Sequence, residues 1–216
     1  GDIVTVNSGA TISGVSIFDG GIGTAVNQLV FNLSSAPLSY AGTIINGTSL
    51  TKNGTNTLTL TGVHTFSNGT NISAGTLAFS GAGSLLNTGK VIINGSGTFD
   101  ISNISTASRT IGDLTGNGNV TLGTKNLTFG TNNSTPQGFT GIISGTGGSL
   151  TKQGTGMILL SGNNTYTDGT IVKAGTFAIN SDSNLGAAYN VTTAPNATLT
   201  LGDSVGNTTG TLLFLG

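Results

Sequence analysis

The only histidine in the sequence, His64, is the residue that a Ser-His-Asp catalytic site would require. It lies in a motif that occurs again 100 residues later, where Asn164 takes the same position. Asparagine does not take up and release a proton as a general base does. A general base is therefore not expected at a position that either residue can occupy. We therefore predict that His64 lies in an exposed turn and is not catalytic.

The acidic residues are the next candidates for catalysis or metal binding. All seven are aspartates, and they are dispersed along the chain. Asp100, Arg109 and Asp113 form the best available cluster for an enzyme, and we interpret it as a salt bridge or a solvated turn. Asp19 is followed by Gly-Gly-Ile-Gly, but the aspartate that follows the glycines in a calcium-binding nonapeptide is missing, so a turn is predicted there.

The sequence contains no cysteine, which excludes disulfides and thiolate metal sites. With dispersed acids and a single histidine, we predict no catalytic, cofactor-binding or metal-binding residues, and no cofactor. The sequence assigns no residues to a binding surface.

The chain carries few charges for its size. Only 6% of the 216 residues are charged and the net charge is −1, while 35% are hydrophobic and 37 are glycine. A disordered chain would need more charge or fewer branched apolar residues, so this chain is expected to fold. Its basic residues stand singly, which gives no stripe that could follow a phosphate backbone and predicts no nucleic-acid partner. They are Lys52, Lys90, Lys125, Lys152, Lys173 and Arg109.

One stretch of the sequence is repeated without gaps. SLTKNGTNTLTLTGVHTFSNGTNISAGTLAFS, from Ser49, aligns with SLTKQGTGMILLSGNNTYTDGTIVKAGTFAIN, from Ser149, at an offset of 149 − 49 = 100 residues. With one gap, the similarity extends back to Tyr40 and Phe139. The repeat indicates stacked, equivalent units. We predict one continuous segment over residues 1–216, with repeat modules near 40–85 and 139–185.

Short strands follow one another within each copy. Thr57 to Thr61 reads T-L-T-L-T, which places two leucines on one face and three threonines on the other, as in a half-buried strand. Further along, the alternation changes parity across Gly75, and a sharp corner there would keep the apolar side chains of both arms inside. Because Gly, Asn and Ser turns separate the strands and no helical period occurs, the sequence predicts an all-β fold.

A β-solenoid explains this pattern better than a sandwich or a membrane barrel does. A sandwich core usually has large aromatic anchors and a membrane barrel has aromatic girdles, but this chain has no Trp and only 3 Tyr. Coils of roughly 20 to 25 residues would give about nine to eleven rungs, stacked about 4.8 Å apart. Uncharged Thr, Ser and Asn side chains can stack outside such coils without repulsion.

The repeated motif resembles the passenger-associated transport repeat of bacterial autotransporters, which typically reads LTKxGxGxLxLxGxNTYxGGTxIxAGTL. Both copies follow this pattern over about thirty residues, and Asn180 to Ala188 resembles the segment that often comes next. His64 replaces the family's Asn, and Asn68 and Asp168 replace a Gly, but these changes keep the turn chemistry. The Asn, Thr and Ile bias is similar to that of rickettsial surface cell antigens and outer membrane protein B.

This resemblance implies a right-handed, single-stranded parallel β-helix presented outside a Gram-negative cell. The implied partner is a C-terminal outer-membrane β-barrel translocator, which we expect to lie outside these residues, and export runs through the periplasm to the cell surface. The expected activity is that of a structural stalk and adhesin, attached through a host-cell receptor or by self-association, with no enzymatic activity and no direct membrane insertion. The alternative is a polysaccharide-active β-helix enzyme, a lyase or hydrolase, in which Asp100 and Arg109 would act.

Overall fold

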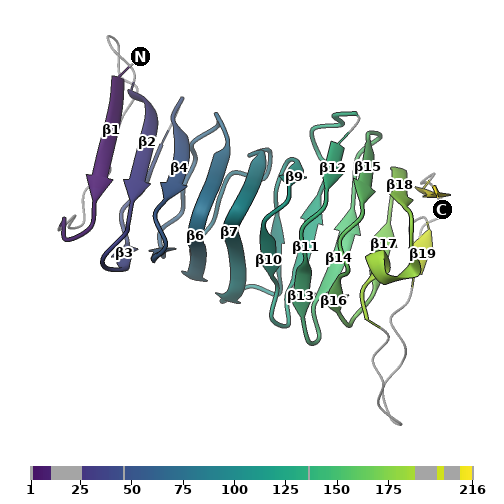
Figure 1. Cartoon of the computed structure of the whole chain (residues 1–216). Coiled ribbons are helices and arrows are strands. Elements are labelled where there is room, and N and C mark those ends of the chain that lie inside the picture. The colour runs from purple at the N-terminus through teal and green to yellow at the C-terminus, as the bar shows by residue number, and fades with distance from the viewer. Residues whose placement is uncertain are drawn as a thin grey trace.

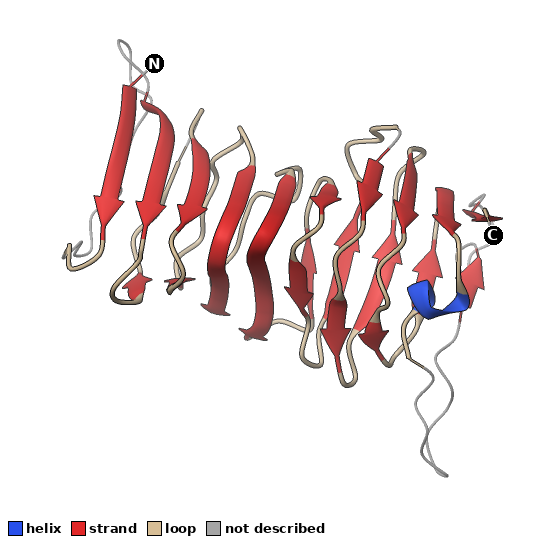
Figure 2. Cartoon of the chain, in the orientation of Figure 1, coloured by secondary structure: helices blue, strands red, loops and turns tan. Residues whose placement is uncertain are grey.

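The computed structural model of the chain describes residues 2–10, 26–45, 47–135, 137–187, 199–201 and 210–215. Within these ranges, parallel strands stack along one axis and the chain coils through them from end to end (Figure 1). The near strands run downward in this view and the far strands return upward while the coil advances, which is right-handed winding. The helix described in these ranges is a single short turn, η1 (Asp182–Leu185), shown in Figure 2. The predicted right-handed parallel β-helix is confirmed.

Each coil passes over up to three faces, which we name A, B and C after the strands that form them. Face A contains β1 (Asp2–Asn7), β2 (Val26–Asn32), β4 (Ser49–Asn53), the first halves of β6 (Thr70–Gly81) and β7 (Val91–Ile104), β9 (Leu114–Gly116), β12 (Gln137–Phe139), β15 (Met157–Leu160), β18 (Gly175–Ile179) and β20 (Gly210–Phe214). Face B contains β3 (Leu38–Tyr40), β5 (Thr57–Leu60), the second halves of β6 and β7, β10 (Asn119–Thr121), β13 (Ile143–Gly145) and β16 (Thr165–Tyr166). Face C contains β8 (Ser108–Thr110), β11 (Asn126–Phe129), β14 (Ser149–Lys152), β17 (Thr170–Val172) and β19 (Leu199–Leu201).

The strands of face A give the number of coils. In the described part of the chain this face has ten strands, of which β2 to β18 form a body of about eight turns, and β1 and β20 add one strand at each end. Within the body, paired residues on neighbouring coils are 19 to 23 residues apart in the sequence, close to the predicted coil length. The body has fewer turns than the about nine to eleven rungs predicted, because that number treated all 216 residues as regular coils.

The interior enclosed by the three faces is apolar. Alternate strand residues point inward, so Leu58 and Leu60 of β5 are fully buried, as the T-L-T-L-T pattern predicted. Phe79 and Phe99 lie on successive coils and pack edge to face, with ring centroids 5.7 Å apart. These contacts repeat from coil to coil and join the described coils into one core.

Gly75 makes the predicted corner within β6. Its φ is +64°, a left-handed conformation that glycine adopts without the cost a Cβ would impose. A Cβ at this position would also overlap the carbonyl oxygen of Gly54 on the preceding coil. Ile72 before the corner and Leu77 after it are both fully buried, so the change of parity keeps the two arms facing the same interior.

The two copies of the repeat are out of phase with the coil. β4 of the first copy lies on face A, whereas β14, which begins with the same SLTK sequence, lies on face C. From β4, the chain crosses face A again at β6, β7, β9 and β12 before it reaches β14. The 100-residue offset is therefore four coils and about two thirds of a fifth. Equivalent residues of the two copies point about a third of a turn apart around the axis.

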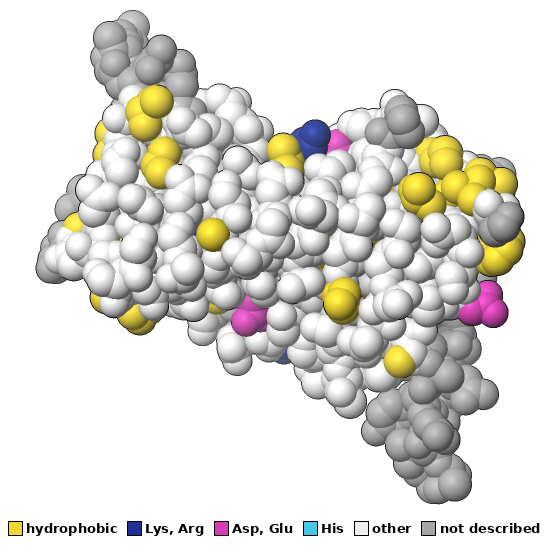
Figure 3. Space-filling view, viewed as in Figure 1, with side chains coloured by type: hydrophobic (Ala, Val, Ile, Leu, Met, Phe, Trp, Pro, Cys, Tyr) yellow, Lys and Arg dark blue, Asp and Glu magenta, His cyan; other side chains and the backbone are white. Residues whose placement is uncertain are grey.

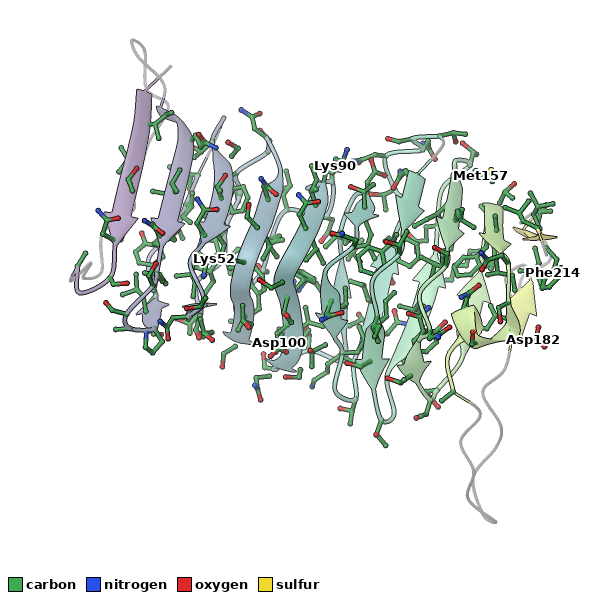
Figure 4. All side chains as sticks on the ribbon, in the orientation of Figure 1. Lys52, Lys90, Asp100, Met157, Asp182 and Phe214 are labelled. Carbon is green, nitrogen blue, oxygen red and sulfur yellow. The ribbon has the colours of Figure 1, made fainter. Side chains whose placement is uncertain are left out.

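The outer surface is polar but almost uncharged. Uncharged side chains and backbone cover most of the face seen in Figure 3. Polar ladders run between coils, as where Asn94 Nδ2 donates to Asn71 Oδ1 at 3.2 Å. Apolar side chains gather at the C-terminal end, where Leu213, Phe214 and Leu215 are exposed (Figures 3 and 4).

Candidate functional site

His64 is a core residue, so its predicted place in an exposed turn is wrong. Its side chain is 1% exposed and its ring lies between those of Tyr40 and Phe66, with centroids 6.2 and 6.3 Å away. His64 Nδ1 accepts a hydrogen bond from the backbone N–H of Ile44 at 3.1 Å. Burial lowers the pKa of His64 to about 4, so the ring is neutral at pH 7.

Asn164 explains why asparagine can replace this histidine. Its Oδ1 accepts a hydrogen bond from the backbone N–H of Ile143 at 2.8 Å, which is the contact that His64 Nδ1 makes in the first copy. The position therefore needs a buried acceptor for the backbone of the preceding coil, and it does not need a base. The prediction of a non-catalytic role rested on this exchange, although the exchange gave no information about burial.

Asp100, Arg109 and Asp113 each bond to different groups. Asp100 Oδ1 accepts from the backbone N–H of Ser102 at 2.8 Å, and Arg109 Nη2 donates to the carbonyl oxygen of Gly83 at 2.8 Å. Asp113 Oδ2 accepts from Ser134 Oγ at 2.7 Å. Among the contacts described for these three residues there is no ion pair between them. The cluster therefore does not bring an acid and a base together around a common space.

The metal-site candidates give a similar result. In the part of the chain that the structure describes, no three His, Cys, Asp or Glu residues lie together as metal ligands would. The Asp19 to Gly23 motif lies outside the described residues.

A buried lysine at the start of each repeat is the feature that the sequence interpretation missed. Lys52 is fully buried, and its Nζ donates to the carbonyl oxygens of Asn53 at 2.8 Å, Gly54 at 2.8 Å and Ala74 at 3.2 Å (Figure 4). The first two carbonyls belong to the last residue of β4 and to the turn after it, and the third belongs to the next coil. The ammonium thus ties two successive coils together at a corner.

Lys152 repeats this arrangement in the second copy. It is 2% exposed, and its Nζ donates to the carbonyl oxygens of Gln153, Gly154 and Ala174, the last two at 2.8 and 3.3 Å. Burial lowers the pKa of both lysines to about 8, and for Lys152 the negative charge of Asp113 opposes this effect. Both remain largely protonated at pH 7, with the three donors of an ammonium facing three acceptors.

The signal for these lysines was present in the strand pattern. Leu50 and Lys52 are two residues apart in β4, so they point to the same side, and Leu50 is fully buried. The same spacing occurs at Leu150 and Lys152 in β14. An inward-facing lysine that is kept in both copies predicts a cation inside the solenoid.

The two copies differ in how well their buried polar atoms are satisfied. In the second copy, the hydroxyls of Tyr166 and Thr170 lie 2.6 Å apart and share a hydrogen bond. In the first copy, Phe66 takes the place of Tyr166, and the Oγ1 of Thr70 has no hydrogen-bond partner although it is buried. His64 Nε2 is also buried without a partner. The first copy therefore has two polar atoms whose burial is not compensated by a hydrogen bond.

A groove with a volume of about 150 Å³ opens on face A beside the first copy. Its walls come from four coils, at β2, β4, β6 and the start of β7. Side-chain amides and hydroxyls line it, with Gln28 Nε2 donating to Thr51 Oγ1 at 2.9 Å, and Ile92 adds an apolar surface. Lys90, exposed at the upper edge of the solenoid in Figure 4, supplies a cation. The polar side chains that line it include Gln28, Thr51, Asn68, Asn71 and Lys90.

Known proteins share both the repeat and the wider sequence. Residues 50–79 and 150–179 each match the family described as passenger-associated-transport-repeat. Over 182 residues, or 81% of this chain, the sequence is 30% identical to the adhesin BmaC autotransporter of Brucella suis biovar 1 (strain 1330). The chain is part of an autotransporter passenger domain. No solved structure matches it.

The passenger assignment confirms the expected location at the bacterial cell surface, reached by export across the outer membrane. The chain spans 5% of the length of the Brucella adhesin, so the activity of the whole protein is a separate question. No helix within the described ranges is long and apolar enough to cross a membrane. The narrower similarity to rickettsial surface antigens stays a prediction.

Proposed function

We propose that this passenger segment serves as a structural stalk and adhesin, which attaches the bacterium to host cells or to sister cells. The main support is the 30% identity, over 81% of this chain, to a protein named as an autotransporter adhesin. The form of the solenoid agrees with a stalk, because each further coil adds about 4.8 Å of length with the same backbone bonding. As the passenger assignment implies, the export partner is a C-terminal outer-membrane β-barrel translocator.

We also propose that the segment has no enzymatic activity. His64 is buried and neutral, and its Nδ1 is occupied by the backbone of Ile44. Arg109, the base that the alternative polysaccharide-active enzyme would use, donates to a backbone carbonyl and is not paired with Asp100 or Asp113. These arrangements favour a binding role over catalysis.

Attachment can be tested with beads coated with the purified 216-residue segment. We expect these beads to be retained on epithelial cells or on bacteria of the producing strain in larger numbers than beads coated with albumin. Retention on the first surface would indicate a host receptor, and retention on the second would indicate self-association. Retention at the albumin level on both surfaces would contradict the adhesin role.

The enzymatic alternative is tested on the same material. The segment is incubated with acidic and neutral polysaccharides, and new reducing ends or unsaturated products are measured. We expect none. Cleavage that is lost in Asp100→Ala or Arg109→Ala would instead establish a polysaccharide-active enzyme.

A further inference from the structure

The groove on face A has a charge that its own residues do not balance. Lys90 contributes an ammonium at the rim, and none of the lining residues is an aspartate. Asp113 lies on the neighbouring coil, where its backbone oxygen accepts from the N–H of Val91, but its carboxylate is buried and bonds to Ser134 and Asn132. A ligand that carries a negative charge would therefore complement this groove.

The remaining polar groups suit a ligand with several hydroxyls. Gln28, Thr51 and Asn71 lie on three successive coils, and parallel strands place such side chains about 4.8 Å apart along the axis. Amides and hydroxyls both donate and accept hydrogen bonds, so a row of them can bind ligand hydroxyls either as donors or as acceptors. The volume of about 150 Å³ can take a small ligand such as one sugar ring but not a folded peptide segment.

The second copy of the repeat lacks this combination. Asp168 replaces Asn68 at the corresponding corner, which places a carboxylate where the first copy has a neutral amide. The second copy also lies on another face of the solenoid, so the two corners do not form one continuous surface. The corner of the second copy, with its carboxylate, is therefore expected to repel an anion.

We propose that the groove binds a uronic acid unit of an acidic glycan, with Lys90 pairing with the carboxylate and Gln28, Thr51 and Asn71 bonding to ring hydroxyls. This inference rests on the proposed adhesin function and names the class of its ligand. The side chains of Asn68 and Ile92 form the neighbouring wall, and the amide of Asn68 already donates to the carbonyl oxygen of Gly47.

The test is a titration of the isotopically labelled 216-residue segment with sodium glucuronate, followed by the shifts of its backbone amide resonances. Glucose is the matched control ligand, because it has the same ring with a hydroxymethyl group in place of the carboxylate. We expect glucuronate at millimolar concentrations to shift the amides of Gly69, Asn71 and Lys90, and glucose to bind at least about tenfold more weakly. Absence of these shifts, or equal shifts with glucose, would overturn the proposal.

Two variants locate the binding. Lys90→Gln removes the cation and Asn68→Asp copies the second repeat, and each should weaken glucuronate binding about tenfold or more. Lys125→Gln, which removes a cation on another part of the solenoid, should leave it unchanged. Loss of binding only in Lys125→Gln would place the ligand elsewhere and refute the groove. The bead assay separates the two proposals, because retained beads without glucuronate binding would refute only the ligand, whereas glucuronate binding without retained beads would refute only cell attachment.

Discussion

At the scale of single residues, Lys52 and Lys152 show how a solenoid with few charges uses them. Moving an ammonium out of water costs several kcal/mol even after the protein relaxes. Hydrogen bonds to a charged group contribute about 1.5 to 3 kcal/mol each, so three of them can offset that cost. Each lysine has three carbonyl acceptors, drawn from two coils. A buried ammonium suits this corner because three backbone carbonyl oxygens there accept hydrogen bonds from a single group.

Replacing either lysine by an apolar residue of similar length tests this account. Lys52→Met leaves three carbonyls without their donor, and we expect the free energy of unfolding to fall by about 2 to 4 kcal/mol in urea denaturation. Lys152→Met should have an effect of similar size. The exposed Lys90→Met is the control and should change stability by less than about 0.5 kcal/mol. An unchanged urea midpoint in Lys52→Met would show that the buried ammonium stabilises nothing.

The same lysines make stability depend on pH in the alkaline range. Their pKa is about 8 in the folded state and near 10.5 in an unfolded chain, so between these values the unfolded state binds more protons. The free energy of unfolding therefore rises with pH from about 8 to 10.5. We expect the urea midpoint to be higher at pH 9.5 than at pH 7.5, with a smaller rise in the Lys52→Met, Lys152→Met double variant. If the urea midpoint instead falls, deprotonation of these lysines costs more, through the lost hydrogen-bond donor, than it gains by removing the buried charge.

His64 should make the first repeat sensitive to acid. Its pKa is about 4 in the folded state and 6.5 in an unfolded chain, so the unfolded state binds more protons between these values. Stability is therefore complete above pH 6.5 and is lost as the pH falls toward 4. His64→Asn keeps an acceptor for the N–H of Ile44, as Asn164 does for Ile143, and carries no charge in acid. We expect its melting temperature to fall less than that of the natural chain between pH 7 and pH 4.5, and an equal fall would exclude His64 as the cause.

At the scale of the strand and its corner, the two copies of the repeat provide reciprocal experiments. Phe66→Tyr offers a hydroxyl to Thr70 Oγ1, which is buried without a partner, and should raise the free energy of unfolding by about 1 kcal/mol. Tyr166→Phe removes the partner of Thr170 and should lower it by about 1 to 2 kcal/mol. Thermal unfolding of both variants checks this. Changes of the same sign in the two variants would contradict the assignment of the hydroxyl pair as the difference between the copies.

The elements themselves were predictable from the sequence because their pattern is local. Alternation identified the inward leucines of β5, and the change of parity identified the corner at Gly75. The interior polar groups were harder to predict, because His64 and Lys52 look like surface residues unless their partners on other coils are known. Those partners lie about 20 residues away in the sequence, and only the stacking of coils brings them together. The groove was not predictable for the same reason, since four coils contribute to it.

At the scale of the whole molecule, the repeat unit and the coil have different lengths. The 100-residue offset holds four coils and about two thirds of a fifth, so a surface patch on one copy is turned away from its counterpart on the other. The residues that both copies keep include interior ones, such as Leu50 and Lys52, and the corner residue Gly75, each with its counterpart, while few exposed residues are shared. The repeat therefore preserves the way that coils stack, while its outer surface is left to differ between copies.

Stacking of this kind predicts how the molecule opens. In the structure each coil bonds chiefly to the coil before it and the coil after it, so an inner coil loses two interfaces on opening and an end coil loses one. Native-state hydrogen exchange should therefore show the slowest exchange in β7 and β9, at the centre of the described body, and progressively faster exchange toward β1 and β20. Lys52→Met should shift the boundary between protected and exchanging coils inward from the N-terminal end and leave β15 and β18 unchanged. Uniform exchange in all coils, with uniform loss in the variant, would mean that residues 1–216 unfold as one cooperative unit and not coil by coil.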